Sequence, residues 1–153
     1  MLKDNAHSLF RLRYGVRVNT SLKLGEHYIV DLSNCDRDLL LDSERAYRAF
    51  SRAIHESGLT VVDEGFYKFS PHGFTCFLLL AESHASLHAW PEYGYCAIDL
   101  FTCAIDKDLL PLIQQIRDAF GATHFSFRKL DRDAELIGRM SLAFASPHLA
   151  EAA

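Results

Sequence analysis

Residues 59–103 read LTVVDEGFYKFSPHGFTCFLLLAESHASLHAWPEYGYCAIDLFTC, and this stretch decides the fold. Its first part, 59–69, is rich in β-branched and aromatic residues, which favours a strand. Turn sequences at 71–73 and 91–94 separate further strands over 74–82, 84–90 and 95–103. Strands that follow one another through tight turns pair antiparallel, so the stretch predicts an antiparallel sheet.

Segments with helical spacing of apolar residues flank this sheet. Asp42 is a suitable N-cap for a helix whose apolar face recurs until Gly58, where a C-cap glycine ends it. A second helix is predicted over 108–120, and further strands over 25–32 and 123–129. Two helices can cover only one face of the sheet. The sequence therefore predicts a two-layer α+β sandwich whose other face is polar or buried against a partner subunit.

The length of 153 residues fits one domain with a substantial core. We expect an irregular N-terminal arm at 1–23, a single domain at 24–140 and a flexible tail at 141–153. Hydrophobic residues make up 49% and charged residues 24%, as in ordinary globular proteins. The formal net charge of −4 argues against a nucleic-acid partner, which would favour a basic chain.

No segment approaches the roughly 20 apolar residues of a membrane span, and the N-terminus lacks the apolar core of a signal peptide. We therefore expect no membrane partner and a cytoplasmic location. The cysteines at 35, 76, 96 and 103 form no C-x-x-C pair. We expect free thiols, of which most serve as small buried hydrophobic residues.

Several reactive side chains cluster in the deciding stretch. Ser83 lies at the end of one apolar strand, and His84, Ser86 and His88 project from one face of the next. Cys103 ends the strand predicted over 95–103, which pairs antiparallel with the strand over 84–90, so Cys103 is expected near Ser83. A nucleophile with a nearby base and a thiol acid is typical of a catalytic site.

Three other interpretations stay open from the residues alone. His84 and His88 with a cysteine are zinc ligands by type, but four residues of strand separate them by about 13 Å, too far to share one metal. A serine–histidine pair suggests a hydrolase, but the G-x-S-x-G pattern is absent. The histidines also fit a solvated strand face. We expect no metal.

A dense motif lies in this stretch: ESHASLHAWPEYGY at 82–95, followed by DLFTC at 99–103. It resembles the signature of the prokaryotic-type S-adenosylmethionine decarboxylase proenzymes, which are pyruvoyl-dependent. Residues 69–75, FSPHGFT, resemble that family's strand, turn and strand before the cut site. The resemblance covers roughly residues 24–140.

The resemblance implies self-cleavage between Glu82 and Ser83. The Ser83 hydroxyl attacks the Glu82 carbonyl, and an N-to-O acyl shift gives an ester. Removal of the Ser83 α-proton then eliminates the Glu82 carboxylate, and the dehydroalanine hydrolyses to a pyruvoyl group and ammonia. The implied products are a β chain of residues 1–82 and an α chain of residues 83–153, which carries the covalent pyruvate cofactor.

Matching positions carry the family's roles. His88 matches the base of the elimination, and imidazole titrates near neutral pH. Thr75 matches a hydroxyl that supports processing; many members have serine there, so the added methyl group implies slower processing. Cys103 matches the acid that protonates the substrate carbon after CO2 leaves a pyruvoyl Schiff base. No metal is required by this chemistry.

The implied substrate is S-adenosylmethionine, and the product is the aminopropyl donor for spermidine. Phe69 matches a family position that contacts the adenosyl group, although a core aromatic is an equal reading, and Glu92 matches one near the site. The family forms homodimers of αβ protomers. Two alternatives stay open: a pyruvoyl-dependent decarboxylase of another amino acid, such as ornithine or arginine, and an unprocessed non-catalytic partner subunit.

Overall fold

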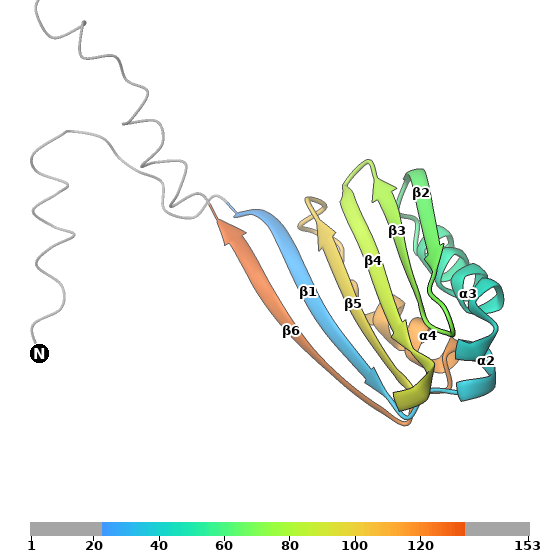
Figure 1. Cartoon of the computed structure of the whole chain (residues 1–153). Helices are drawn as coiled ribbons and strands as arrows, with labels where there is room; N and C mark the ends of the chain where they lie inside the picture. Colours follow the sequence, from blue (N-terminus) through green and yellow to red (C-terminus); the bar gives the residue numbers. More distant parts are fainter. Residues whose placement is uncertain (1–22, 134–153) are drawn as a thin grey trace, which may run out of the picture. The chain divides into compact units, whose positions relative to one another are not determined.

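The computed structural model describes residues 23–133. Six strands form one sheet in the order β2-β3-β4-β5-β1-β6 (Figure 1). They are β1 Lys23–Ser33, β2 Val61–Lys68, β3 Phe74–Leu80, β4 Ser83–Trp90, β5 Tyr95–Thr102 and β6 His124–Asp133. The predicted arm, apart from Lys23, and the predicted tail at 141–153 lie outside the described residues.

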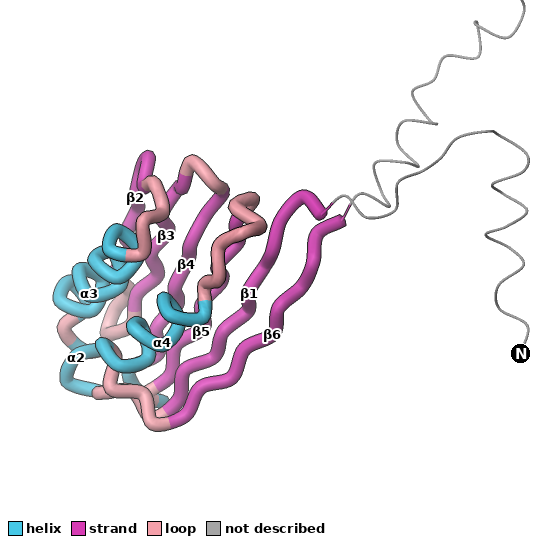
Figure 2. The backbone as a smooth tube through the Cα atoms, turned by 180° about the vertical axis from the view of Figure 1, so that it is seen from behind, coloured by secondary structure: helices cyan, strands magenta, loops and turns pink. Residues whose placement is uncertain are grey.

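The consecutive strands β2 to β5 pair antiparallel, as their tight turns predict, and β1 then pairs antiparallel with β5. The helices α3 (Ser43–Glu56) and α4 (Leu110–Ala119) lie on one face of this sheet (Figure 2). The predicted two-layer α+β sandwich is therefore confirmed. None of the described helices is long and apolar enough to span a membrane.

Local signals explain where the helices begin and end. The Asp42 carboxylate accepts a 3.1 Å hydrogen bond from the Arg45 N–H, so it caps α3, and Gly58 follows that helix with φ 75°. Pro111 lies in the first turn of α4, where its missing N–H costs little. The sequence did not predict the short helix α2 (Arg37–Leu41), which Asp36 caps by accepting from two backbone N–H groups.

The core lies between the helices and the sheet. On β4 the alternate residues Ala85, Leu87 and Ala89 are buried on the helix side. They meet Phe50 and Ile54 of α3 and the apolar face of α4 in one hydrophobic cluster. The intervening β4 residues therefore point to the other face of the sheet.

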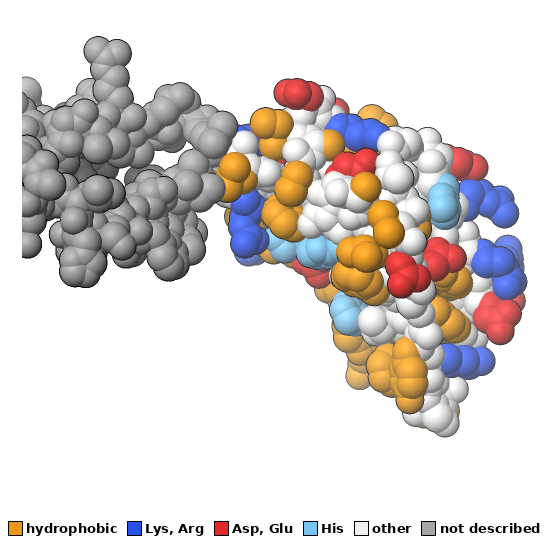
Figure 3. Space-filling view, turned by 90° about the horizontal axis from the view of Figure 1, so that it is seen from above, with side chains coloured by type: hydrophobic (Ala, Val, Ile, Leu, Met, Phe, Trp, Pro, Cys, Tyr) orange, Lys and Arg blue, Asp and Glu red, His pale blue; other side chains and the backbone are white. Residues whose placement is uncertain are grey.

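That other face, which we call the open face, has no helix over it. It carries histidine side chains beside large exposed hydrophobic residues, namely Ile29, Phe77, Leu79 and Trp90. Figure 3 views the molecule from the end that bears the β3–β4 turn and shows histidine and hydrophobic side chains next to one another at the surface. Such a mixture fits a face that another surface covers.

Candidate active site

The bond between Glu82 and Ser83 lies where the β3–β4 turn meets β4. Ser83 pairs with Leu80 on β3 and with Thr102 on β5. The next residue, Cys103, therefore lies beside Glu82, and its backbone N–H donates a 2.8 Å hydrogen bond to the Glu82 carbonyl oxygen. A donor on a carbonyl oxygen favours attack on the carbonyl carbon, because it stabilises the negative charge that develops there.

The backbone of Ser83 is irregular. Its φ is 150°, a value that L-residues rarely adopt. Such a conformation costs on the order of 1–3 kcal/mol and persists only where the surroundings hold it. The strained torsion is about the N–Cα bond of Ser83, next to the peptide bond of interest, so cleavage of that bond releases the constraint.

The Glu82 side chain is held as well. Its carboxylate accepts a 3.0 Å hydrogen bond from the N–H of Thr60, the residue just before β2. Burial alone would raise the pKa of Glu82, but hydrogen bonds from Thr60 and from its own backbone N–H, together with the charge of Lys107, lower it below its usual value. Both sides of the Glu82–Ser83 bond are therefore fixed by neighbouring strands.

His84 follows Ser83 and belongs to a compact aromatic group on the open face. Its Nδ1 lies 3.4 Å from the Ser83 Oγ. Its ring stacks on Phe77 with 5.6 Å between centroids, meets Phe101 edge-on at 5.8 Å, and lies 6.3 Å from the His27 ring. The His27 Nε2 in turn lies 3.0 Å from the Asp99 Oδ1.

A second cluster forms at the other end of β4. Thr75 and His88 face each other across β3 and β4, and the Thr75 Oγ1 lies 2.7 Å from the His88 Nδ1. Both residues line a surface pocket of about 410 Å³, together with Phe69, Trp90 and Glu92. Four residues selected from the sequence, Phe69, Thr75, His88 and Glu92, thus meet in one pocket.

The two clusters are well separated within one chain. His88 is five residues beyond Ser83 on β4, which corresponds to about 16 Å at 3.3 Å per residue. Ser83 and Cys103 do not line the pocket that holds His88. One copy of the chain therefore brings Cys103 to Ser83 but does not bring His88 there.

The thiols divide as follows. Cys35, Cys76 and Cys96 are free and buried, and Cys103 is free and exposed. Burial raises the pKa of the Cys76 thiol to about 12, so this sulfur stays protonated and serves as packing. Among residues 23–133, no three His, Cys, Asp or Glu side chains come together in a group that could hold a metal ion.

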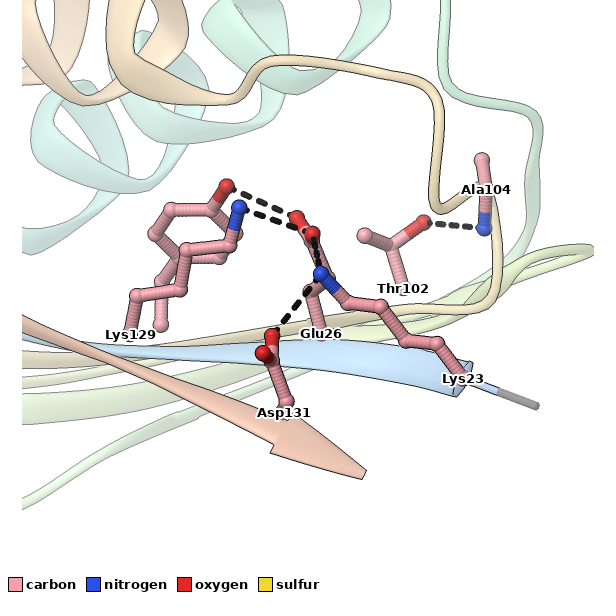
Figure 4. Close-up of polar contacts among 7 residues, drawn as sticks. Lys23, Glu26, Thr102, Ala104, Lys129 and Asp131 are labelled. Carbon is pink, nitrogen blue, oxygen red and sulfur yellow. Dashed lines mark hydrogen bonds and ion pairs between the residues drawn. The ribbon is translucent and has the colours of Figure 1, made fainter. Parts of the chain in front are cut away.

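A buried carboxylate, that of Glu26, lies on the helix side of the sheet, next to Thr102, the residue before Cys103. Glu26 is only 2% exposed and pairs in register with Thr102. Its carboxylate bonds to Lys23, to Lys129 at 2.7 Å and to the Tyr28 hydroxyl at 2.9 Å (Figure 4). Burial alone would raise the pKa of Glu26, but these three hydrogen bonds lower it to about 2.

Sequence reasoning missed two of these features. The alternation around Tyr28 already puts His27 on the open face, yet no local signal pairs it with Asp99, 72 residues away. The link between Glu26 and Lys129 is similarly long-range, because it joins β1 to β6. Only the strand order, β5-β1-β6, brings either pair together.

Comparison with known proteins agrees with this geometry. The family model described as S-adenosylmethionine decarboxylase matches residues 26–133. An S-adenosylmethionine decarboxylase proenzyme of Thermotoga maritima is 38% identical over 99 residues, which are 65% of this chain and 76% of that relative. A proenzyme of Thermosipho africanus is 41% identical over 85 residues, 56% of this chain and 65% of that relative.

A solved structure agrees as well. The crystal structure of the adenosylmethionine decarboxylase from Aquifex aeolicus superposes with a TM-score of 0.68 and 29% sequence identity. The match covers 73% of this chain and 92% of that one. The family match includes both β4 clusters and the Glu82–Ser83 bond at the start of β4. The chain therefore belongs to the S-adenosylmethionine decarboxylase family.

Proposed function

We propose that the chain cuts itself between Glu82 and Ser83 and that Ser83 becomes a covalent pyruvoyl group. Family membership makes the chain a carboxy-lyase that acts on S-adenosylmethionine. We propose that its product is the aminopropyl donor for spermidine. The observation that carries self-cleavage is the hydrogen bond from the Cys103 N–H to the Glu82 carbonyl oxygen. This hydrogen bond stabilises the negative charge that develops on the Glu82 carbonyl oxygen when the Ser83 hydroxyl attacks.

The cut proceeds in two steps. The Ser83 Oγ bonds to the Glu82 carbonyl carbon while the C–N bond breaks, so the amide becomes an ester. A base then takes the Ser83 α-proton, the Glu82 carboxylate leaves, and the dehydroalanine takes up water and releases ammonia. The products are residues 1–82 and residues 83–153, the second with a pyruvoyl group at its N-terminus.

The sheet topology keeps these products together. Strands β1, β2 and β3 belong to the N-terminal product, and β4, β5 and β6 belong to the C-terminal product. In the sheet, β3 pairs with β4, and β1 lies between β5 and β6. The cut thus breaks one peptide bond in a turn while the strand pairs on either side remain.

The surroundings of Ser83 fit the pyruvoyl group, because a fixed N–H donor and an exposed thiol lie beside it. That group supplies a carbonyl that takes the substrate amine and accepts the electrons released as CO2 leaves. We propose that Cys103 then donates the proton that replaces CO2 on the substrate carbon. Its place at the end of β5, next to Glu82, supports this role.

The elimination base is proposed to be His88, and it must come from a second copy. The separation of about 16 Å along β4 rules out direct contact between His88 and Ser83 of one chain. We propose that two copies stack their open faces about a two-fold axis that reverses the strand direction. The Ser83 end of one copy then faces the pocket of the other, where the partner's His88 and the partner's Thr75 lie.

The chemistry of the open face supports this dimer. Phe77 and Leu79 of β3 are each 43% exposed in the single chain, and Ile29 of β1 is 36% exposed. An antiparallel sheet with one solvated face would carry polar residues at these positions. Burial of such side chains between two copies removes apolar surface from water, which favours a dimer.

The pocket supports S-adenosylmethionine over the amino-acid alternatives. Phe69 and Trp90 present aromatic surface to the space beside His88, and Glu92 adds a carboxylate. Aromatic faces attract a sulfonium cation and can stack on a purine. Ornithine and arginine are also cations that an aromatic face attracts, but they have no purine ring to stack there. We propose that Phe69 and Glu92 bind the adenosyl part of the substrate.

The intact mass of the purified protein, measured under denaturing conditions, tests self-cleavage. The expected result is two chains divided between Glu82 and Ser83, with the C-terminal chain blocked to Edman sequencing. The Ser83→Ala variant is the matched control and stays whole. Release of labelled CO2 from S-adenosylmethionine, ornithine and arginine then identifies the substrate. A wild-type chain that stays whole through long incubation contradicts the proposal and favours a non-catalytic subunit.

A further inference from the structure

The first processing step needs a base of its own. The Ser83 hydroxyl must lose its proton as Oγ attacks the Glu82 carbonyl carbon. Within one chain His88 lies about 16 Å away, whereas the Nδ1 of His84 lies 3.4 Å from the Ser83 Oγ. Among residues 23–133, His84 is therefore the histidine whose imidazole contacts the nucleophile.

The contact depends on the irregular backbone at Ser83. Consecutive residues in a regular strand point to opposite faces of the sheet, which would separate the side chains of Ser83 and His84. The φ of 150° at Ser83 departs from a regular strand at this position. The strained φ torsion of Ser83 thus lies next to the Glu82–Ser83 peptide bond and also brings the Ser83 hydroxyl to the ring of His84.

The surroundings of His84 keep its imidazole neutral and fixed. Burial lowers its pKa, and His27 lowers it further, while Asp99 opposes the shift. The groups that face it are Phe77 from β3, Phe101 from β5 and His27 from β1, and Arg132 of β6 covers the Phe101 ring at 5.3 Å. A neutral imidazole with Nε2 protonated has a free lone pair on Nδ1, which accepts from the Ser83 hydroxyl.

We propose that His84 is the general base of the acyl shift, a role separate from that of the elimination base. The inference rests on the proposed self-cleavage. Nδ1 takes the proton from the Ser83 Oγ, Oγ bonds to the Glu82 carbonyl carbon, and the Cys103 N–H holds the carbonyl oxygen. The C–N bond then breaks, and the proton on Nδ1 passes to the departing Ser83 nitrogen, so the step consumes no proton overall.

His27 and Asp99 act as positioning residues for this base. Their 3.0 Å contact fixes the His27 ring, which meets the His84 ring at an interplanar angle of 72°. His27 therefore limits the rotation of His84 from the side opposite Phe77. Asp99 holds the His84 ring in place through its hydrogen bond to His27, and its charge also raises the pKa of His84 directly.

The two proposed bases predict different trapped species. Without the acyl-shift base, the chain remains an amide, which hydroxylamine does not cleave. Without the elimination base, the chain still exchanges with the ester, which hydroxylamine cleaves to a Glu82 hydroxamate and a free Ser83 N-terminus. Hydroxylamine sensitivity of the uncut chain therefore distinguishes loss of the first base from loss of the second.

The test uses full-length chains produced by pulsed cell-free synthesis and followed by intact mass. We expect His84→Gln to slow cleavage by roughly 10²- to 10⁴-fold, the usual contribution of a general base, and to leave an uncut chain that resists hydroxylamine. His88→Gln should give an uncut chain that hydroxylamine cleaves. His55→Gln, at an exposed position on α3, is the matched control and should cut at the wild-type rate.

The pH profile of wild-type cleavage provides a second measurement that does not depend on the folding of a variant. Nδ1 works only when deprotonated, so the rate should fall as pH drops through the pKa of His84. His27→Gln removes a neighbour that lowers this pKa, so the inflection should move to higher pH. An unmoved inflection, wild-type cleavage by His84→Gln, or a hydroxylamine-sensitive His84→Gln chain overturns the inference. An uncut wild-type chain instead overturns self-cleavage itself.

Discussion

The backbone N–H of Cys103 donates a 2.8 Å hydrogen bond to the carbonyl oxygen of Glu82. One residue thus places two groups beside Glu82, a main-chain donor and an exposed thiol, and we propose that the first serves self-cleavage and the second decarboxylation. The N–H belongs to the backbone and the proposed proton donor to the side chain, so substitution can separate the two proposed functions.

Cys103→Ala should cut itself at close to the wild-type rate but lose decarboxylation by at least about 100-fold, since it keeps the N–H and removes the acid. Cys103→Pro removes the N–H as well, and cleavage should slow by about 10²- to 10³-fold. Intact mass over time gives the cleavage rate, and CO2 release per cut chain gives the activity. Equal cleavage rates for the two variants would show that the N–H has no part in the cut.

Thr75 should matter through its hydroxyl, which lies 2.7 Å from the His88 Nδ1. Thr75→Val keeps the shape but removes the hydrogen bond, so we expect cleavage to slow by about 10-fold or more, the equivalent of one or two hydrogen bonds. Thr75→Ser keeps the hydroxyl without the methyl group and should cut at least as fast as the wild type. A Thr75→Val chain that cuts at the wild-type rate would remove Thr75 from processing.

Glu26 should make the free energy of unfolding depend on pH in the acidic range. Its pKa is lowered from 4.5 to about 2, so its contribution to stability is complete above about pH 5 and is lost as pH falls toward 2. At pH 7, Glu26→Gln should lower the free energy of unfolding by about 1.5–3 kcal/mol, the usual contribution of hydrogen bonds to a charged group.

Urea unfolding of the uncut Ser83→Ala chain, with and without Glu26→Gln, measures this difference at each pH. The two curves should converge between pH 5 and pH 2. Glu44→Gln is a suitable control, because Glu44 forms only an exposed pair with Arg48 on α3. A difference that stays constant over this range would mean that Glu26 acts by packing rather than by charge.

The fold was predictable because its signals are local. Turn sequences such as 91–94 and the alternation of 84–90 specify the order and register of the strands β2 to β5, and Asp42 and Gly58 mark the ends of α3. The site was predictable only in part. The register Thr75–His88 follows from one hairpin, but the pair His27–Asp99 depends on β1 lying beside β5, for which the intervening sequence gives no signal.

The distance between the two clusters on β4 gives the most direct test of the dimer. A chain with His88→Gln keeps Ser83 but lacks the proposed elimination base, and a Ser83→Ala chain lacks the proposed nucleophile but still offers His88. If the base acts from the partner subunit, His88→Gln chains should remain whole alone and should be cut when co-expressed with Ser83→Ala chains of a different mass.

Random pairing of two copies expressed at equal levels sets the expected extent: about half of the His88→Gln chains should meet a Ser83→Ala partner and be cut. Co-expression with the double variant Ser83→Ala/His88→Gln is the control, because this partner supplies the same open face without the imidazole. Cleavage with the single variant but not with the double variant assigns the base to the other copy. Cleavage of His88→Gln chains alone would mean that His88 is not the elimination base, and no cleavage in either mixture would place the base within the cut chain.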